Sequence, residues 1–178
     1  MISLNLLTEL NLTCLPLGLK FPCFFFFLST NLYAAGGSSG GDGQESKQSN
    51  YKSAVNYVKA GKKLEKKGKI EKAKVKYEKA FKRLLKANDK DPSNPDVLNY
   101  LGFTSRKLGD FKSAENYYLS GLKINPNHNG INEYLGELYL STNRPEKAKE
   151  RLAVLQNCNC EEYEELKAII DGTKQSKY

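Results

Sequence analysis

The stretch Pro95–Pro126, PDVLNYLGFTSRKLGDFKSAENYYLSGLKINP, decides the fold. Pro95 suits the first turn of a helix, because that position has no intrahelical hydrogen bond to lose. Pro126 ends a second helix, because proline cannot continue one. Small side chains on both helices would let the two backbones approach closely. These small residues are Gly102, Ala114 and Gly121. The stretch therefore predicts two antiparallel helices joined by a short turn near Leu108-Gly109.

The same pattern recurs further along the chain. Leu101-Gly102 is repeated 34 positions later as Leu135-Gly136, and Ala114 is repeated at the same spacing as Ala148. Self-similarity at a fixed period of this length is typical of stacked helical hairpins. An earlier, more divergent unit aligns through Ala73, 41 positions before Ala114. We therefore predict an all-α solenoid of three helix-turn-helix repeats. Their approximate bounds are 54–92, 95–128 and 129–158.

The segments around the repeats predict a capping helix and two unstructured stretches. Asn159 followed by Glu162 is a capping box, and it predicts a C-terminal helix over 160–171 that covers the open end of the solenoid. Residues 36–50 are rich in Gly, Ser and Gln, which is typical of a flexible linker. The folded domain is therefore predicted over 51–172, followed by a disordered tail over 173–178.

The first 35 residues predict export. An apolar run over Phe21–Leu28 follows Lys20, and the small residues Ala34 and Ala35 supply a place where a signal peptidase would cut. The run is much shorter than the roughly 20 residues needed to span a bilayer, so we expect no permanent membrane span. We predict a cleavable signal peptide over 1–35. The alternative is a disordered cytosolic leader.

Positive charge is concentrated in the first predicted repeat. The formal net charge of the chain is +8, and residues 51–90 hold 15 Lys or Arg against 4 Asp or Glu. Clustered cations bind phosphates by releasing counterions, so a basic surface that binds nucleic acid or another polyanion is the alternative function. However, these lysines circle the predicted helices, and pairs such as Glu65 and Lys69 have the i,i+4 spacing of ordinary helix ion pairs. This pattern favours a solvated surface, and nucleic acid is not the expected partner.

No residue pattern predicts catalysis. His128 is the only histidine, and it is predicted to lie in the turn after Pro126 without a positioned partner. The sequence has no glycine-rich phosphate loop and no spaced set of metal ligands, so we expect no catalytic residue, metal or cofactor. Cys158 and Cys160 would remain after export. Three roles stay open for them: a disulfide, thiols that are free or joined to a partner, or redox or metal activity.

The repeats resemble the tetratricopeptide repeat family. With Pro95 as position 1, the family's pattern falls on Leu98, Leu101, Gly102, Ala114, Tyr118, Gly121 and Pro126. With Asn129 as position 1, it falls on Leu135, Gly136, Tyr139, Ala148, Leu152 and Leu155. The export signal, the three units and the ending CEEYEEL at 160–166 look like small exported bacterial proteins of this family without an assigned role. The resemblance implies a scaffolding or protein-binding role and, with the signal, a location in the bacterial periplasm.

The resemblance also implies a concave groove lined by the first helix of each repeat. Transferred by register, its candidate partner-binding residues are Lys62, Lys66, Asn99, Phe103, Arg106, Glu133 and Glu137. An exposed Phe103 beside Lys62 and Arg106 would anchor an extended peptide bearing a carboxylate; the alternative is that Phe103 packs against a neighbouring helix. The family's clamp for chaperone tails is not reproduced, because Asn99 and Phe103 replace two of its residues. We therefore expect a non-enzymatic module of the cell envelope that binds a protein or peptide. Its partner's identity and its oligomeric state stay open.

Overall fold

The computed structural model describes residues 47–176, and every regular element among them is an α-helix. The helices are α1 (Lys47–Glu65), α2 (Ile70–Lys90), α3 (Pro95–Lys107), α4 (Phe111–Ile124), α5 (Asn129–Ser141), α6 (Pro145–Leu155) and α7 (Glu161–Ile170). None of these described helices has both the length and the apolar character needed to cross a membrane. The predicted signal peptide, residues 36–46 of the predicted linker and residues 177–178 lie outside the described residues.

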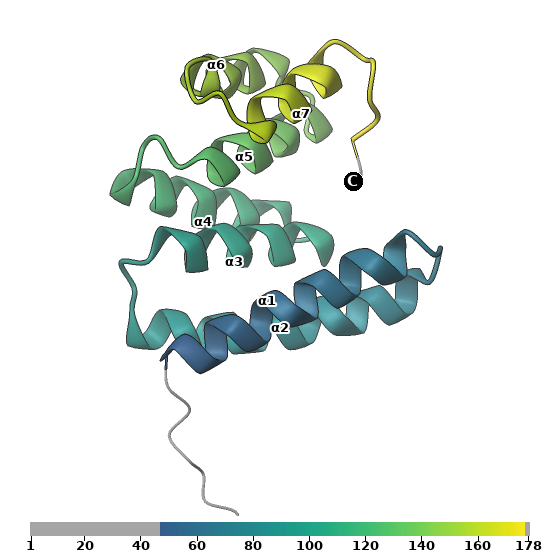
Figure 1. Ribbon diagram of the computed structural model, residues 1–178, viewed down its shortest axis with the longest axis vertical. Coiled ribbons are helices and arrows are strands. Elements are labelled where there is room, and N and C mark those ends of the chain that lie inside the picture. The colour runs from purple at the N-terminus through teal and green to yellow at the C-terminus, as the bar shows by residue number, and fades with distance from the viewer. Residues whose placement is uncertain (1–46, 177–178) are drawn as a thin grey trace, which may run out of the picture. The chain divides into compact units, whose positions relative to one another are not determined.

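The helices form three successive hairpins with α7 at the end (Figure 1). Within the hairpins α1 packs on α2, α3 on α4, and α5 on α6. Neighbouring hairpins meet through α2 and α3 and through α4 and α5, while α3 also contacts both α1 and α5. The final helix packs on α5 and α6. The predicted solenoid of three helical repeats with a C-terminal capping helix is confirmed.

Glycine against a large side chain sets the close packing of each first helix. A methyl group on Gly102 of α3 would lie 2.4 Å from the ring of Tyr118, which is fully buried on α4. Gly61 of α1 has the same relation to Tyr77 of α2, at 2.5 Å. In the third hairpin, Gly136 faces Leu166 of α7 instead. The capping helix thus packs closely on the last repeat, as the sequence predicts.

Left-handed residues end the first helix of each repeat at matching positions. Gly109 has a φ of 88° and Asn143 a φ of 57°, and these two residues are 34 positions apart. After each of them the chain turns back onto its helix, so that Asp110 N–H donates to the carbonyl of Ser105 at 2.9 Å. Glycine adopts this conformation at no steric cost, and asparagine tolerates it better than most residues. The second helix of each repeat therefore begins in the same orientation.

Three predicted boundaries differ from the structure. Helix α1 begins at Lys47 instead of at 51, because Asn50 is buried and accepts a hydrogen bond from Arg83. The capping box at Asn159 is wrong: Asn159 has a φ of 49°, and the residue before α7 is Cys160, whose side chain forms no capping bond. Residues 173–176 were predicted to be disordered, but Thr173 N–H donates to the carbonyl of Ala168 at 3.0 Å and holds this segment against α7.

Candidate functional site

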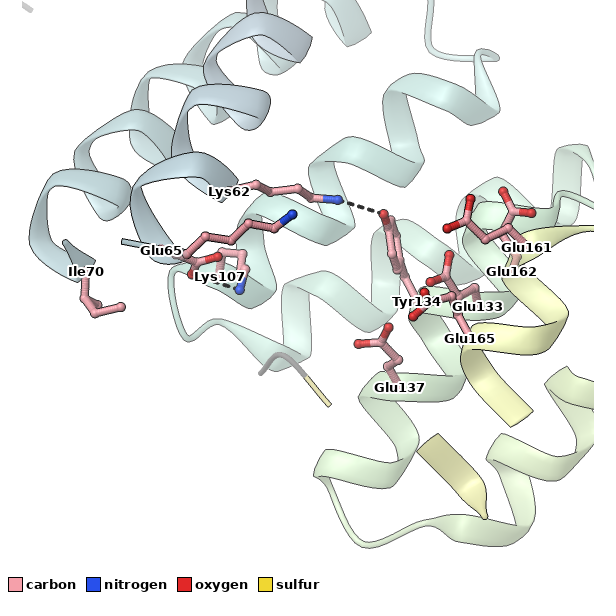
Figure 2. A pocket seen from close by; sticks show the side chains of 11 residues that line it. Lys62, Glu65, Ile70, Lys107, Glu133, Tyr134, Glu137, Glu161, Glu162 and Glu165 are labelled. Carbon is pink, nitrogen blue, oxygen red and sulfur yellow. Dashed lines mark hydrogen bonds and ion pairs between the residues drawn. The ribbon is translucent and has the colours of Figure 1, made fainter. Parts of the chain in front are cut away.

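A groove of about 610 Å³ lies between the first helices of the repeats and the capping helix (Figure 2). It is lined by Lys62, Glu65, Lys66, Ile70, Lys107, Glu133, Tyr134, Glu137, Glu161, Glu162 and Glu165. Lys62 comes from α1, Lys66 from the turn that follows α1, and Lys107 from α3, whereas all glutamates except Glu65 come from α5 and α7. We call Lys62, Lys66 and Lys107 the basic wall. We call Glu133, Glu137, Glu161, Glu162 and Glu165 the acidic wall.

The cations of the basic wall are largely engaged within the protein. Lys62 Nζ donates to the hydroxyl of Tyr134 at 3.1 Å and lies 4.5 Å from the centre of the Phe103 ring. Lys107 Nζ pairs with Glu65 at 2.9 Å, so the predicted pairing of Glu65 with Lys69 is wrong. Burial lowers the pKa of Lys107, although the ion pair with Glu65 opposes this shift. Lys66 remains exposed at the edge of the groove.

Phe103 is not an exposed anchor for a partner. Its side chain is 0% exposed and fills the space between the first and third hairpins. The ring packs edge-on against Tyr77, with 5.8 Å between ring centres, and lies 5.3 Å from the ring of Tyr134. The predicted contact between Phe103 and a partner is therefore wrong, and the alternative of local packing holds. An aromatic side chain in this position stabilises the stack.

Arg106 and Asn99 are also buried and do not line the groove. Arg106 is 3% exposed; its Nη2 pairs with Glu137 at 3.3 Å and its Nη1 donates to the carbonyl of Tyr134 at 3.2 Å. This guanidinium is neutralised inside the protein, so the prediction that it binds a partner's carboxylate is wrong. Asn99 is 7% exposed and lies beside Gly130, between α3 and α5. The structure places only Lys62, Lys66, Glu133 and Glu137 of the seven predicted residues on the groove.

The acidic wall holds carboxylates without a neutralising cation. Glu133, Glu161 and Glu162 form no ion pair with any residue among 47–176. Burial raises the pKa of Glu133 to about 8, and the nearby charges of Glu137 and Glu162 add to the shift, while Lys62 opposes it. A buried carboxylate beside other carboxylates is costly to ionise, and a cation placed next to it would remove that cost. The wall is thus suited to a positively charged ligand.

Comparison with known proteins identifies the repeats. The tetratricopeptide repeat family model matches residues 105–170. Residues 105–170 therefore contain tetratricopeptide repeats. The solved first tetratricopeptide repeat domain of human RPAP3 is 24% identical, with a TM-score of 0.51 over 70% of this chain and 94% of that chain. The first such domain of Spaghetti (RPAP3) bound to the HSP90 peptide SRMEEVD is 24% identical, with a TM-score of 0.50 over 69% of this chain and 94% of that chain.

A bacterial structure has the same fold. The type III secretion translocator chaperone SycD of Yersinia enterocolitica is 18% identical, with a TM-score of 0.51 over 72% of this chain and 89% of that chain. No curated protein sequence matches the chain. At these identities the structural likeness establishes the tetratricopeptide repeat fold, and the site must be argued from this chain's own residues.

Two features of the groove were missed by reasoning from the tetratricopeptide repeat pattern. Tyr134 lies between the two walls, where it accepts a hydrogen bond from Lys62 and packs on Phe103. Glu161, Glu162 and Glu165 come from α7, which was interpreted only as a cap. The run of glutamates at 161–165 was visible in the sequence. The sequence did not show that α7 packs on α5, and this contact turns the run of glutamates toward the groove.

The cysteines and the histidine of the last two repeats have structural positions. Cys158 and Cys160 are joined in a disulfide within the loop that leads to α7, which agrees with the first of the three roles left open for them. His128 caps α5: its Nδ1 accepts from Ile131 N–H at 3.2 Å, and its Nε2 donates to Asp96 at 3.1 Å. Among residues 47–176 no group of three His, Cys, Asp or Glu side chains is arranged to hold a metal ion.

Proposed function

We propose that this protein is a non-enzymatic binding module that holds an extended segment of a protein partner in its tetratricopeptide repeat groove. The observation that carries the proposal is a groove of about 610 Å³ in which three carboxylates of one wall have no ion-pair partner among the described residues. Carboxylates gathered in one wall repel one another, and a cation of a bound ligand would offset that repulsion. The RPAP3 domain that resembles this chain was solved with a bound peptide, which supports the proposal.

Binding explains the groove better than a reaction does. Among the carboxylates of the acidic wall, Glu133 has an unusual proton affinity, because burial raises its pKa to about 8. Its electrostatic neighbours are Lys62 and other carboxylates, so it has no nucleophile to activate. The only histidine caps a helix instead of facing the groove. We therefore assign the shifted pKa to burial of the acidic wall, and we assign no reaction to the site.

We further propose that the protein acts in the bacterial cell envelope after cleavage of the signal peptide over 1–35. The support is the apolar run over Phe21–Leu28 and the small residues at Ala34 and Ala35. Sequencing the N-terminus of the protein isolated from a periplasmic extract tests this proposal. A mature chain that starts at Ala35 or Gly36 is expected. Recovery of the chain from the cytosol with Met1 retained would contradict it.

Selection from a displayed random-peptide library tests the groove as the binding site. Peptides selected on the full chain should lose at least about tenfold in affinity for the double variant Glu161→Gln with Glu162→Gln, because two groove-lining glutamates without an ion-pair partner among the described residues become neutral. The matched control is Glu150→Gln with Glu164→Gln, which neutralises two exposed glutamates outside the groove lining. Equal losses in both double variants would contradict the proposal. If the affinity fell steeply with added salt and neither double variant changed it, the result would favour the polyanion alternative.

A further inference from the structure

The chain turns back on itself directly after the capping helix. Gly172 has a φ of 72°, and the N–H groups of Thr173 and Lys174 both donate to the carbonyl of Ala168 at 3.0 Å. The hydroxyl of Thr173 donates to the same carbonyl at 3.0 Å. This turn fixes the direction of the residues that follow it. We call residues 173–176 the C-terminal segment.

The C-terminal segment contacts the acidic wall through two side chains. The ammonium group of Lys174 pairs with Glu165. The hydroxyl of Ser176 donates to Glu137 Oε2 at 3.4 Å. Glu165 belongs to α7 and Glu137 to α5, and both line the groove. A lysine of the C-terminal segment thus already occupies part of the wall that we assign to the partner.

The ion pair between Lys174 and Glu165 is weak enough for a competing ligand to displace it. The side chains of Lys174 and Glu165 are 35% and 22% exposed, and an ion pair with this much access to water contributes little to stability. The segment holds only part of the wall, because Glu133, Glu161 and Glu162 remain without an ion-pair partner among residues 47–176. A longer segment that brings its own cation would therefore gain contacts that the C-terminal segment does not make.

We propose that the C-terminal segment is an intramolecular ligand of the acidic wall, and that the partner segment which displaces it presents a lysine or arginine to the same carboxylates. The inference rests on the proposed function and specifies the chemistry of the partner. A tethered ligand acts at a high effective concentration. The apparent affinity of a competitor is therefore reduced to the fraction of molecules in which the tethered ligand has left the site. This competition makes the groove selective for cationic segments, because a segment without a cation would not replace the ion pair that Lys174 makes with Glu165.

A partner with a carboxylate at this wall is disfavoured by the same charges. Five glutamates line the acidic wall, and the guanidinium nearest to them, Arg106, is buried against Glu137. A second negative chain would meet carboxylates at close range, and like charges brought together at an interface cost several kcal/mol. The expected partner is therefore of opposite charge to the carboxylate-bearing peptide predicted from the sequence.

Binding of the chain's own terminal peptide in trans tests the proposal. The probe is a fluorescent, N-acetylated peptide with the sequence of residues 172–178, Gly-Thr-Lys-Gln-Ser-Lys-Tyr. It should bind the full chain carrying Lys174→Glu about fivefold more tightly than the unmodified chain, because the internal competitor is expelled. Lys174→Ala should change the affinity in the same direction by a smaller factor. The same peptide with glutamate in place of its first lysine should bind neither chain.

Second substitutions in the Lys174→Glu chain locate the binding site. Adding Glu165→Gln should remove the gain in probe affinity, whereas the matched control Glu164→Gln, an exposed neighbour on α7, should leave it unchanged. Equal probe affinity for the unmodified and Lys174→Glu chains, or equal effects of the two second substitutions, would overturn the proposal. If library-selected peptides still depended on Glu161 and Glu162 in that case, groove binding would stand and only the role of the C-terminal segment would fall.

Discussion

The two walls of the groove carry opposite charges, but they use them differently. On the basic wall, Lys62 bonds to Tyr134 and Lys107 pairs with Glu65, so these cations hold the repeats together. On the acidic wall, Glu133 has no ion-pair partner among residues 47–176, and its pKa is raised because it is buried. The difference shows that within the groove the basic side chains stabilise the stack, whereas the acidic side chains are available to a ligand.

Removing the buried cation behind the groove should have the largest effect. The side chain of Arg106 is 0% exposed and pairs with Glu137, so Arg106→Ala removes a buried cation together with its ion pair. We expect the free energy of unfolding to fall by about 3–5 kcal/mol. Urea unfolding followed by circular dichroism measures this loss. The control is Lys149→Ala, which breaks an exposed pair with Glu146 and should cost less than about 0.5 kcal/mol. Equal losses would contradict a structural role for Arg106.

Neutralising Glu133 should change how stability depends on pH. Its pKa is raised from 4.5 to about 8 in the folded protein, so the folded state retains a proton that the unfolded state releases between these values. The protein should therefore lose stability as pH rises from about 4.5 through 8, on the order of 3 kcal/mol from this group. Glu133→Gln should be more stable than the unmodified protein at pH 9, and the gap should shrink toward pH 5. Urea unfolding at both pH values checks this, and a gap that does not change with pH would contradict it.

Removing the disulfide before α7 should have a smaller effect on stability. Cys158 and Cys160 close a very short loop before α7, so their bond restricts the unfolded chain only slightly. We expect the double variant with serine at both positions to lose about 1–2 kcal/mol of unfolding free energy. The effect should equal that of reductant on the unmodified protein, measured by urea unfolding. A further loss on adding reductant to the double variant would show that this disulfide is not the source.

Removing the exposed lysine of the basic wall should have the smallest effect. Lys66 is exposed and forms no ion pair among the described residues. Lys66→Ala should therefore change the free energy of unfolding by less than about 0.5 kcal/mol. It should also leave the affinity for a lysine-bearing peptide unchanged within about twofold. Calorimetric titration measures the affinity, and a tenfold loss would assign partner binding to the basic wall.

The fold was predictable because its determinants are local in sequence. Pro95 at a helix start, Gly109 in the turn after that helix and Pro126 after the second helix define a hairpin within a short stretch. The period of 34 positions that relates Gly102 to Gly136 then defines the stack. These features depend on residues a few positions apart, so the number of repeats and most of the helix bounds could be derived without coordinates.

The site was predictable only in part because side-chain exposure depends on the stacking. The register of the repeat pattern placed Phe103 and Arg106 on the concave side of α3. In the structure Tyr134 of the next repeat covers Phe103, and Glu137 pairs with Arg106. Both covering residues are about 30 positions away in the sequence, and no local pattern reports them. The same limit applies to Glu165, which reaches the groove only because α7 packs on α5.

Mapping amide chemical shifts during titration with a charged peptide tests the central claim most directly. The labelled full chain would be titrated with the acetylated peptide of residues 172–178 and with its counterpart in which both lysines are replaced by glutamate. The account predicts that the lysine peptide shifts the amides of Glu133, Glu137, Glu162 and Glu165, and that the glutamate peptide does not. Shifts confined to the lysine-rich helix α2, or stronger binding of the glutamate peptide, would contradict it.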